Sequence, residues 1–161
     1  MLVRAARVED VPHAARVHHQ SSEAAYAGVP NAPTLARREG LWREVLANPE
    51  RWPYVVESER EVVGVLIIGP ASEEADAGEL YAIYVHPSWW GTGAAQRLID
   101  CAHEQLATRF RRAVLTVLAS NSRARRFYER NGWVLEQVKS EPQPLFGGAP
   151  TEVALYRKSL D

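Results

Sequence analysis

Hydrophobic and polar residues follow two different periods along this chain, and the period changes near residue 90. Residues 79–85 are rich in aromatic and β-branched side chains, which is typical of a strand. After residue 93, small and aliphatic residues recur at helical spacing, which indicates a helix with one packed face. Gly91 and Gly93 therefore lie where a buried strand turns into a helix.

The rest of the pattern predicts further strands and helices in a mixed order. Besides 79–85, strands are expected at 2–6, 54–57, 62–68, 113–118, 134–138 and 152–157. Helices are expected from a cap at Asp10 towards Tyr26, over 34–47, after Gly93, and from Asn121 to Asn131. The strand, helix and strand between 79 and 118 should form a right-handed parallel crossover. Open α/β sheets bind ligands at the carboxyl ends of such strands.

Composition narrows the class of protein. With 161 residues, 46% of them hydrophobic, the chain can build one good core, so a single domain over residues 1–161 is expected. A net charge of −1 argues against nucleic acid as a partner. The single cysteine, Cys101, excludes a disulfide within the chain and fits a cytoplasmic protein. The longest apolar run, 62–68, is too short to span a membrane, so no membrane partner is expected.

The glycine turn favours an anion, because the first N–H groups of a helix have no intrahelical partner and point outward. A Walker loop would need Gly-Lys-Ser/Thr, and no lysine lies near this turn. A dinucleotide fingerprint would need glycine where Gln96 stands, together with an acidic residue after strand 113–118, which ends in Ala-Ser-Asn. One charge at a helix start gains only about 0.3–2 kcal/mol. A phosphate bound here must therefore belong to a larger ligand, and the alternative is a turn that only connects the two elements.

A second motif follows the next strand and limits these choices. It runs Asn-Ser-Arg-Ala-Arg-Arg-Phe-Tyr-Glu-Arg-Asn-Gly from Asn121 to Gly132, a short helix with a polar cap and a left-handed stop. Together the two segments resemble the GNAT superfamily of acyl-CoA-dependent N-acetyltransferases. The matching positions are Val85, Pro87, Gly93, Ala95, Asn121, Ala124, Phe127, Tyr128 and Gly132. One position departs from the family motif, because Trp90 stands where it has arginine or glutamine.

The resemblance implies a mixed, mostly antiparallel α/β (α+β) sheet of about seven strands, with a central parallel pair that splays apart and helices on its flanks. It implies acetyl-CoA as the co-substrate, with the pantetheine arm between the splayed strands and its phosphates at the glycine turn. No metal is expected, because His13, His18 and His19 lack a companion group of ligands. The coenzyme A site is assigned to Ile83, Tyr84, Val85, Trp90, Gly91, Thr92, Gly93, Ala94, Ala95, Gln96, Asn121, Arg125 and Phe127.

The implied chemistry needs a base and an acid. A primary amine with a pKa near 10.4 is mostly protonated at neutral pH, so a base or a desolvating pocket is needed. Glu79 is the candidate base, expected to share a strand face with Tyr81, Ile83 and Val85, although it could instead be a carboxylate paired with an arginine. Tyr128 is the candidate acid for the departing thiolate. Enzymes of the superfamily that acetylate protein N-termini commonly carry a glutamate where this chain has Thr116. This difference weakens the assignment of the chain to that group of enzymes and leaves the identity of the base open.

The acceptor is less defined than the cofactor. Aromatic residues that could form its wall are Tyr26, Trp42, Tyr54 and Tyr81, and core packing is the alternative reading of each. Nearby acidic residues Glu73 and Glu74 would favour a cationic amine. The expected function is transfer of an acetyl group to a small primary amine in a ternary complex. A protein or peptide acetyltransferase and a non-catalytic acyl-CoA-binding module are the alternatives, and a homodimer is compatible with each.

Overall fold

A computed structural model of the chain describes residues 1–25, 33–142 and 148–161. Its centre is one seven-stranded sheet in the order β1-β2-β3-β4-β5-β7-β6. The strands are β1 Leu2–Ala5, β2 Trp52–Ser58, β3 Glu61–Pro70, β4 Gly78–Val85, β5 Arg112–Leu118, β6 Val134–Pro142 and β7 Pro150–Ser159. The helices are α1 Val11–Ala25, α2 Leu35–Ala47, α3 Ala94–Ala107 and α4 Ser122–Arg130, with short 3-10 helices η1 Val8–Asp10 and η2 Pro87–Trp89.

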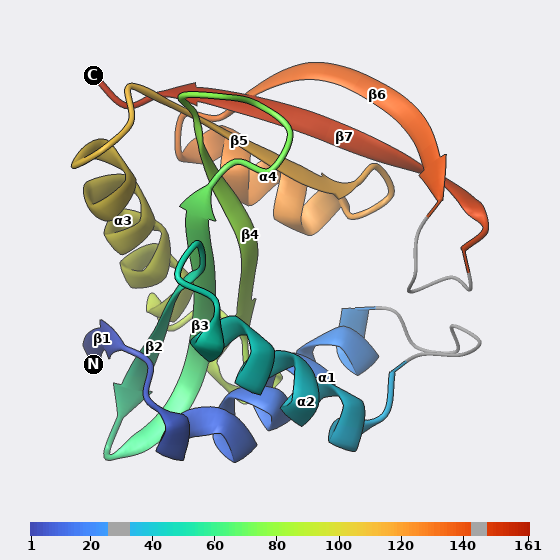
Figure 1. Cartoon of the computed structure of the whole chain (residues 1–161). Helices are drawn as coiled ribbons and strands as arrows, with labels where there is room; N and C mark the ends of the chain where they lie inside the picture. The colour runs from blue at the N-terminus through green and yellow to red at the C-terminus, as the bar shows by residue number, and fades with distance from the viewer. Residues whose placement is uncertain (26–32, 143–147) are drawn as a thin grey trace.

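All neighbouring strands are antiparallel except β4 and β5. These two pair in parallel only at Gly78 with Ala113 and at Glu79 with Val114. In Figure 1 they then diverge, so that β5, β6 and β7 lie across the upper part of the molecule while β1 to β3 run below. The expected mixed sheet with a splayed parallel pair is confirmed.

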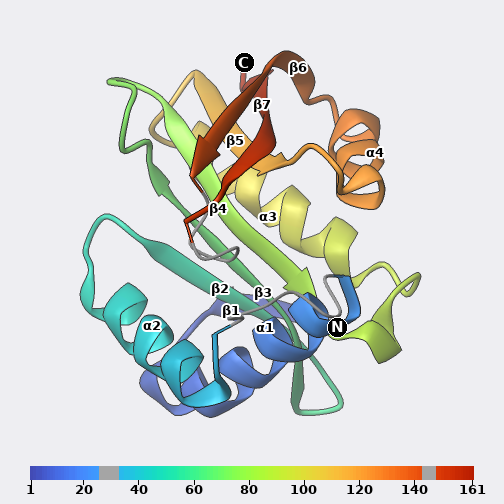
Figure 2. The ribbon, with the colours of Figure 1, turned by 90° about the vertical axis from the view of Figure 1, so that its right-hand side faces the viewer.

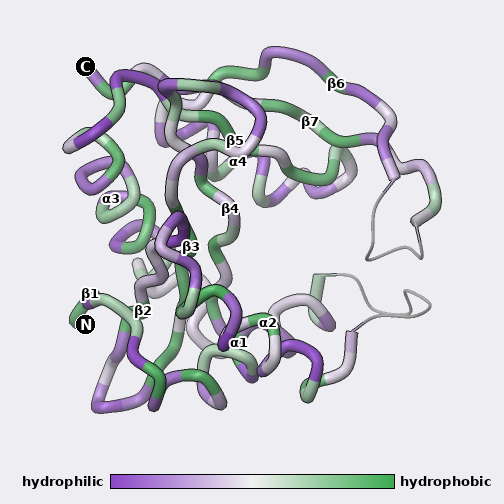
Figure 3. Tube along the Cα trace, viewed as in Figure 1, coloured by the Kyte–Doolittle hydropathy of each residue, from purple (hydrophilic) through white to green (hydrophobic). Residues whose placement is uncertain are grey.

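The helices cover the sheet in two pairs, each with its own core. Valines of α1 pack with Trp42 of α2 and with β2 and β3 residues such as Val55 and Val65. On the opposite face, leucines of α3 pack with β3, β4, β5 and β7 and with Tyr128 and Trp133. Figure 2 shows α3 and α4 on one side of the sheet and α1 and α2 on the other. Hydrophobic and hydrophilic residues recur along each turn of α3, as expected for a helix buried on one face (Figure 3).

Most expected elements form, with longer strands at the carboxyl end and a different start to the first helix. Asp10 does not cap α1; it closes η1, where its carboxylate accepts the Arg7 N–H at 2.7 Å and pairs with Arg4 at 2.8 Å. Thr34 caps α2 through the Arg37 N–H. In the part of the chain that the structure describes, no helix is long and apolar enough to cross a membrane.

A β-bulge in β4 changes which side chains share a face. Ile67 pairs with Ala82 and Ile68 pairs with Leu80, so Tyr81 has no partner in β3. Tyr81 packs towards the core under α1 and α2, whereas Ile83 and Val85 pack towards α3. The expectation that Glu79 shares a face with Ile83 and Val85 is therefore wrong, because an inserted residue shifts the alternation. Bulges are common beside active sites, where they redirect side chains.

Candidate functional site

The glycine turn is shaped for a ligand that approaches the backbone. Gly91 and Gly93 have φ of 76° and 91°, a left-handed conformation that side chains disfavour. A Cβ placed on either glycine would have no atom within 4 Å, so the space above the turn is open. The 14-residue α3 starts at this turn with no side-chain cap on its first N–H groups. The turn therefore fits the phosphates that the resemblance assigns to it.

Backbone groups of β4 are open on the side that faces β5. Beyond Glu79, β4 pairs with β3 but not with β5 among the described strands. The side chains of Ile83 and Val85 are held in the α3 core, and the Tyr84 ring stacks on His18 with centroids 4.3 Å apart. Residues 83–85 can therefore meet a pantetheine arm through their backbone, as the resemblance implies, but the Val85 carbonyl already accepts a hydrogen bond from the Trp90 indole.

Several expected coenzyme A contacts already have partners within the protein. The Asn121 side chain accepts the Ala124 N–H at 3.1 Å and so caps α4. Gln96 donates to Asp100 and, at 2.7 Å, to Asn131 at the end of α4. The Arg125 guanidinium donates to the Tyr156 hydroxyl and to the Ala119 carbonyl, each at 2.9 Å. Phe127 is partly buried against the core. These side chains fix α4 beside α3, which gives them a positioning role whatever else they contact.

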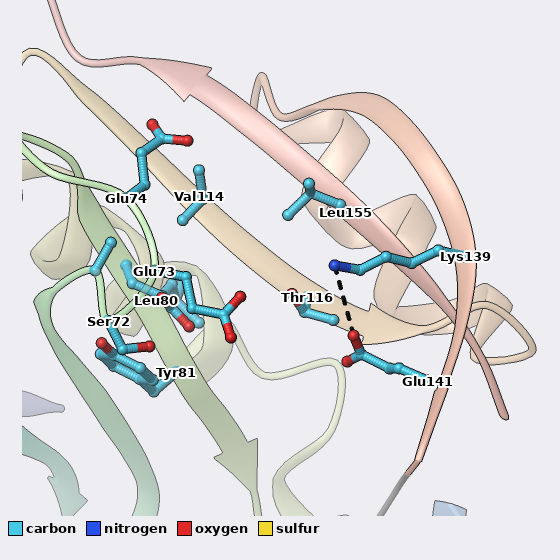
Figure 4. Close-up of a pocket in the computed structure, with 12 residues that line it drawn as sticks. Ser72, Glu73, Glu74, Leu80, Tyr81, Val114, Thr116, Lys139, Glu141 and Leu155 are labelled. Carbon is cyan, nitrogen blue, oxygen red and sulfur yellow. Dashed lines mark ion pairs between the residues drawn. The ribbon is translucent and has the colours of Figure 1, made fainter. Parts of the chain in front are cut away.

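A pocket of about 420 Å³ opens between β4 and the β5–β7 part of the sheet, near the residues where β4 and β5 separate. Figure 4 shows that its walls come from the β3–β4 loop, β4, β5, β6 and β7. Its lining combines acidic residues with apolar ones: Ala71, Ser72, Glu73, Glu74, Glu79, Leu80, Tyr81, Val114, Thr116, Lys139, Glu141 and Leu155. Volumes of this order are typical of small-molecule sites.

Two of the four carboxylates in this lining are neutralised by neighbours. Lys139 and Glu141, both on β6, approach to 3.5 Å. Glu74 pairs with Arg157 at 2.7 Å and with Arg112 at 2.9 Å. No ion pair among the described residues involves the other two, Glu73 and Glu79. The pocket therefore presents excess negative charge to whatever occupies it.

Glu79 has the surroundings of a group that exchanges protons. Burial raises the pKa of its carboxyl, while a hydrogen bond from the Ser72 backbone and the charge of Arg51 act in the opposite direction. A raised carboxyl pKa near a cleft is a common property of general bases. The alternative, an ion pair with an arginine, does not occur among the described residues: Arg51, whose charge acts on Glu79, has its guanidinium 3.8 Å from the centroid of the Tyr81 ring.

The Glu74 cluster is structural, and it yields a stability prediction. The two arginines lower the pKa of Glu74 to about 2 from an ordinary 4.5. Because the pKa is lowered on folding, the stabilisation is complete above pH 4.5 and is lost as the pH falls towards 2. The side chain is 32% exposed, so solvent screening limits the effect. We expect Glu74→Gln to lower the free energy of unfolding by about 1–2 kcal/mol at pH 7.

Urea denaturation at pH 7 and at pH 3 measures this effect. The difference between Glu74→Gln and the native protein should shrink to less than half at pH 3. Glu73→Gln, which removes a neighbouring carboxylate without an ion pair among the described residues, is the control and should leave stability nearly unchanged. Equal stability of Glu74→Gln and the native protein at pH 7 would show that the cluster contributes nothing.

Tyr128 lies in an aromatic cluster at the base of α4. Its side chain is 7% exposed, and its ring centroid lies 6.4 Å from those of both Trp133 and Tyr156. Its backbone carbonyl accepts the Trp133 N–H at 3.1 Å, which closes the helix at the left-handed Gly132. The ring is therefore fixed in position within the α3 core, and Tyr128 is not among the residues that line the pocket.

The aromatic residues expected at the acceptor site do not lie together. Tyr81 lines the pocket, and its hydroxyl donates to the Pro70 carbonyl at 2.5 Å. Trp42 has no exposed surface and belongs to the core beneath α1 and α2. Tyr54 packs on the opposite face, against the α3 core. Tyr26 lies outside the described residues.

Lys139, Glu141 and Leu155 line the pocket although sequence reasoning did not select them. Lys139 and Glu141 lie on β6 beyond its expected end at residue 138, whereas Leu155 lies within the expected part of β7. Side chains alternate between the two faces of the strand along residues 134–142, and this pattern was the available signal for the pocket residues. The pattern does not say which of the two faces covers a pocket. Among the described residues, no group of three or more His, Cys, Asp or Glu could hold a metal ion.

Comparison with known proteins identifies the family of this chain. The model of the acetyltransferase (GNAT) family matches residues 16–133, well over half of the chain. The chain belongs to the GNAT acetyltransferase family. Curated proteins give no significant match. GNAT enzymes use acetyl-CoA, and the open turn and the unpaired edge of β4 suit that co-substrate.

Solved structures of other acetyltransferases share the fold of this chain over nearly their whole length. A ribosomal-protein-alanine N-acetyltransferase from Brucella melitensis is 20% identical, with 99% of each chain covered and a TM-score of 0.80. An acetyltransferase from Thermus thermophilus is 20% identical, with 99% and 97% covered and a TM-score of 0.78. A protein provisionally named phosphinothricin N-acetyltransferase is 15% identical, with 99% and 98% covered and a TM-score of 0.79. At these identities the similarity shows the fold and leaves the acceptor open.

Proposed function

We propose that this GNAT enzyme transfers the acetyl group of acetyl-CoA directly to the primary amine of a small cationic molecule. The pocket carries this proposal, because Glu73 and Glu79 leave it negatively charged where β4 and β5 separate. Its apolar walls, Leu80, Val114 and Leu155, suit the carbon skeleton of an amine. Tyr81 lines the same pocket as Glu79.

Glu79 takes one proton from the substrate ammonium, and the neutral nitrogen then attacks the thioester carbonyl. The new C–N bond forms, the C–S bond breaks, and the thiolate of coenzyme A receives a proton from Tyr128, whose phenolate takes up the second proton that the nitrogen releases. Deprotonating an ammonium group with a pKa of 10.4 near pH 7 costs about 4–5 kcal/mol, and a base lowers this part of the barrier. A backbone N–H near Val85 polarises the carbonyl. No covalent acetyl-enzyme is needed.

A protein or peptide acceptor is the second candidate. The similarity to the ribosomal-protein-alanine N-acetyltransferase fold favours it, since the same sheet and helices occur in that enzyme. Thr116 lines the pocket at the position where the superfamily's N-terminal acetyltransferases commonly have glutamate. That substitution, together with the limited volume of the pocket, favours the small amine.

Release of free thiol from acetyl-CoA across an amine panel tests the proposal. We expect the highest kcat/KM with small aliphatic amines that carry a second positive charge, lower values with neutral monoamines, and the lowest with peptides bearing a free N-terminal alanine or lysine. A kcat/KM for either peptide above that for every small amine would transfer the assignment to a protein acceptor. Binding of acetyl-CoA with no thiol release from any amine would contradict the proposed reaction.

A further inference from the structure

Trp90 is tied to the end of β4 by a hydrogen bond, although its side chain is exposed. It follows η2 and directly precedes Gly91. Its indole Nε1–H donates to the Val85 carbonyl at 2.8 Å, which fixes the ring against the last residue of the strand. The side chain is still 37% exposed, so one part of the ring remains available to other groups. A tryptophan here cannot supply the guanidinium or amide donors of the family motif.

A guanidinium reaches this ring from α4, the helix that follows the other strand of the splayed pair. Arg123 lies in the first turn of α4, after β5, and its Cζ is 3.7 Å from the centroid of the Trp90 ring. No ion pair among the described residues involves Arg123. Arg125 differs, because its donors are directed to Tyr156 and Ala119. Arg123 is thus a cation held beside the glycine turn with its charge uncompensated by a described carboxylate.

Stacking leaves the hydrogen-bonding edge of Arg123 available. A guanidinium that lies on an aromatic ring uses its flat face, while its five N–H donors point outward in the plane. The stack itself is worth only about 0.5–1 kcal/mol at an exposed site, so it orients the group without neutralising it. Planar paired donors match the oxygens of a phosphate.

We propose that Arg123, oriented by Trp90, binds the diphosphate of coenzyme A and replaces the arginine or glutamine absent from position 90. The donor then comes from the α4 side of the splayed strands and the N–H groups come from the α3 side. Bound diphosphate therefore joins the carboxyl ends of β4 and β5. The inference rests on the use of acetyl-CoA but not on the identity of the acceptor.

Calorimetric titration with coenzyme A and with pantetheine, which has no phosphate, tests this assignment without any turnover. We expect Arg123→Ala to weaken coenzyme A binding by about 10- to 100-fold, the range for a lost charge-assisted hydrogen bond. Pantetheine binding should change less than about twofold. Arg126→Ala removes another exposed arginine of α4 and is the matched control, expected to change coenzyme A binding by less than about threefold.

A rescue variant separates this role from a general effect of charge or folding. Placing arginine at the motif position of the Arg123→Ala protein, as Trp90→Arg/Arg123→Ala, should recover most of the lost coenzyme A affinity. Equal losses in Arg123→Ala and Arg126→Ala, or a matching loss for pantetheine, would overturn the proposal. Native protein that binds no coenzyme A would instead contradict the assumed co-substrate.

Discussion

Replacing Tyr128 with phenylalanine is expected to lower kcat by about 100-fold or more while the dissociation constant for coenzyme A changes less than about twofold. General acids contribute about 10²- to 10⁴-fold, and the departing thiolate, with a pKa of about 8.5 by analogy with cysteine, is the group to be protonated. Phenylalanine keeps the ring contacts with Phe127, Trp133 and Tyr156, so packing is retained. Steady-state kinetics and calorimetric titration measure the two quantities.

Tyr156→Phe is the matched control, because it removes a second phenol from the same aromatic cluster. The Tyr156 hydroxyl accepts a hydrogen bond from Arg125 at 2.9 Å and donates to Glu129 at 3.3 Å, so its loss affects α4 rather than the reacting atoms. We expect a lower melting temperature and a nearly native kcat. If both variants lose rate equally, or Tyr128→Phe keeps the native rate, Tyr128 is not the acid.

Glu79→Gln is expected to reduce kcat/KM by about 100-fold near neutral pH, since a base contributes about 10²- to 10⁴-fold. The native activity should fall at acid pH as Glu79 becomes protonated, and this fall should begin above pH 4.5 because burial raises the pKa of the carboxyl. In the glutamine variant the remaining activity should lose that acid limb. A pH–rate profile of kcat/KM for both proteins provides the measurement.

Stability should respond in the opposite direction to activity at this residue. A carboxyl whose pKa is raised on folding favours the folded state below its unfolded pKa and loses that contribution as the pH rises through the folded pKa. Glu79→Gln removes the ionised buried group, so its free energy of unfolding at pH 7 should equal or exceed the native value. Glu73→Gln, in the same pocket, should keep the acid limb and most of kcat. A Glu79→Gln protein that is inactive because it is unfolded would contradict the assignment.

The strand, turn and helix between residues 79 and 107 were predictable because local signals agree. A β-branched and aromatic run, two glycines and a helical apolar period all specify the same element order. Asn121 and Gly132 likewise mark the start and end of α4 through capping and a left-handed stop. The framework of the site, meaning the splayed pair and its two helices, follows from these segments.

Features that depend on long-range contacts could not be predicted in the same way. The bulge at Tyr81 is decided by pairing with β3, so alternation alone groups Tyr81 wrongly with Ile83 and Val85. Glu74 meets Arg157 across 83 positions of sequence, and no local pattern records that pairing. Trp42 and Tyr54 are aromatic like Tyr81, but their depth in the two cores is set by helix packing. The contact of Arg123 with Trp90 also joins segments that only the folded sheet brings together.

Because β4 and β5 pair at only two positions, the rest of β4 has an unpaired edge on the side that faces β5, in the middle of the sheet. Exposed strand edges normally invite pairing with other chains, and proteins protect them with charge, bulges or covering elements. Here the open length of β4 lies between helices of its own fold, with a bulge at Tyr81 and the β6–β7 hairpin above it. The backbone groups along that edge are therefore left for a ligand, rather than a neighbouring strand, to satisfy, as the proposed coenzyme A site requires. The same interruption that weakens the continuity of the sheet thus supplies hydrogen-bonding groups to the site.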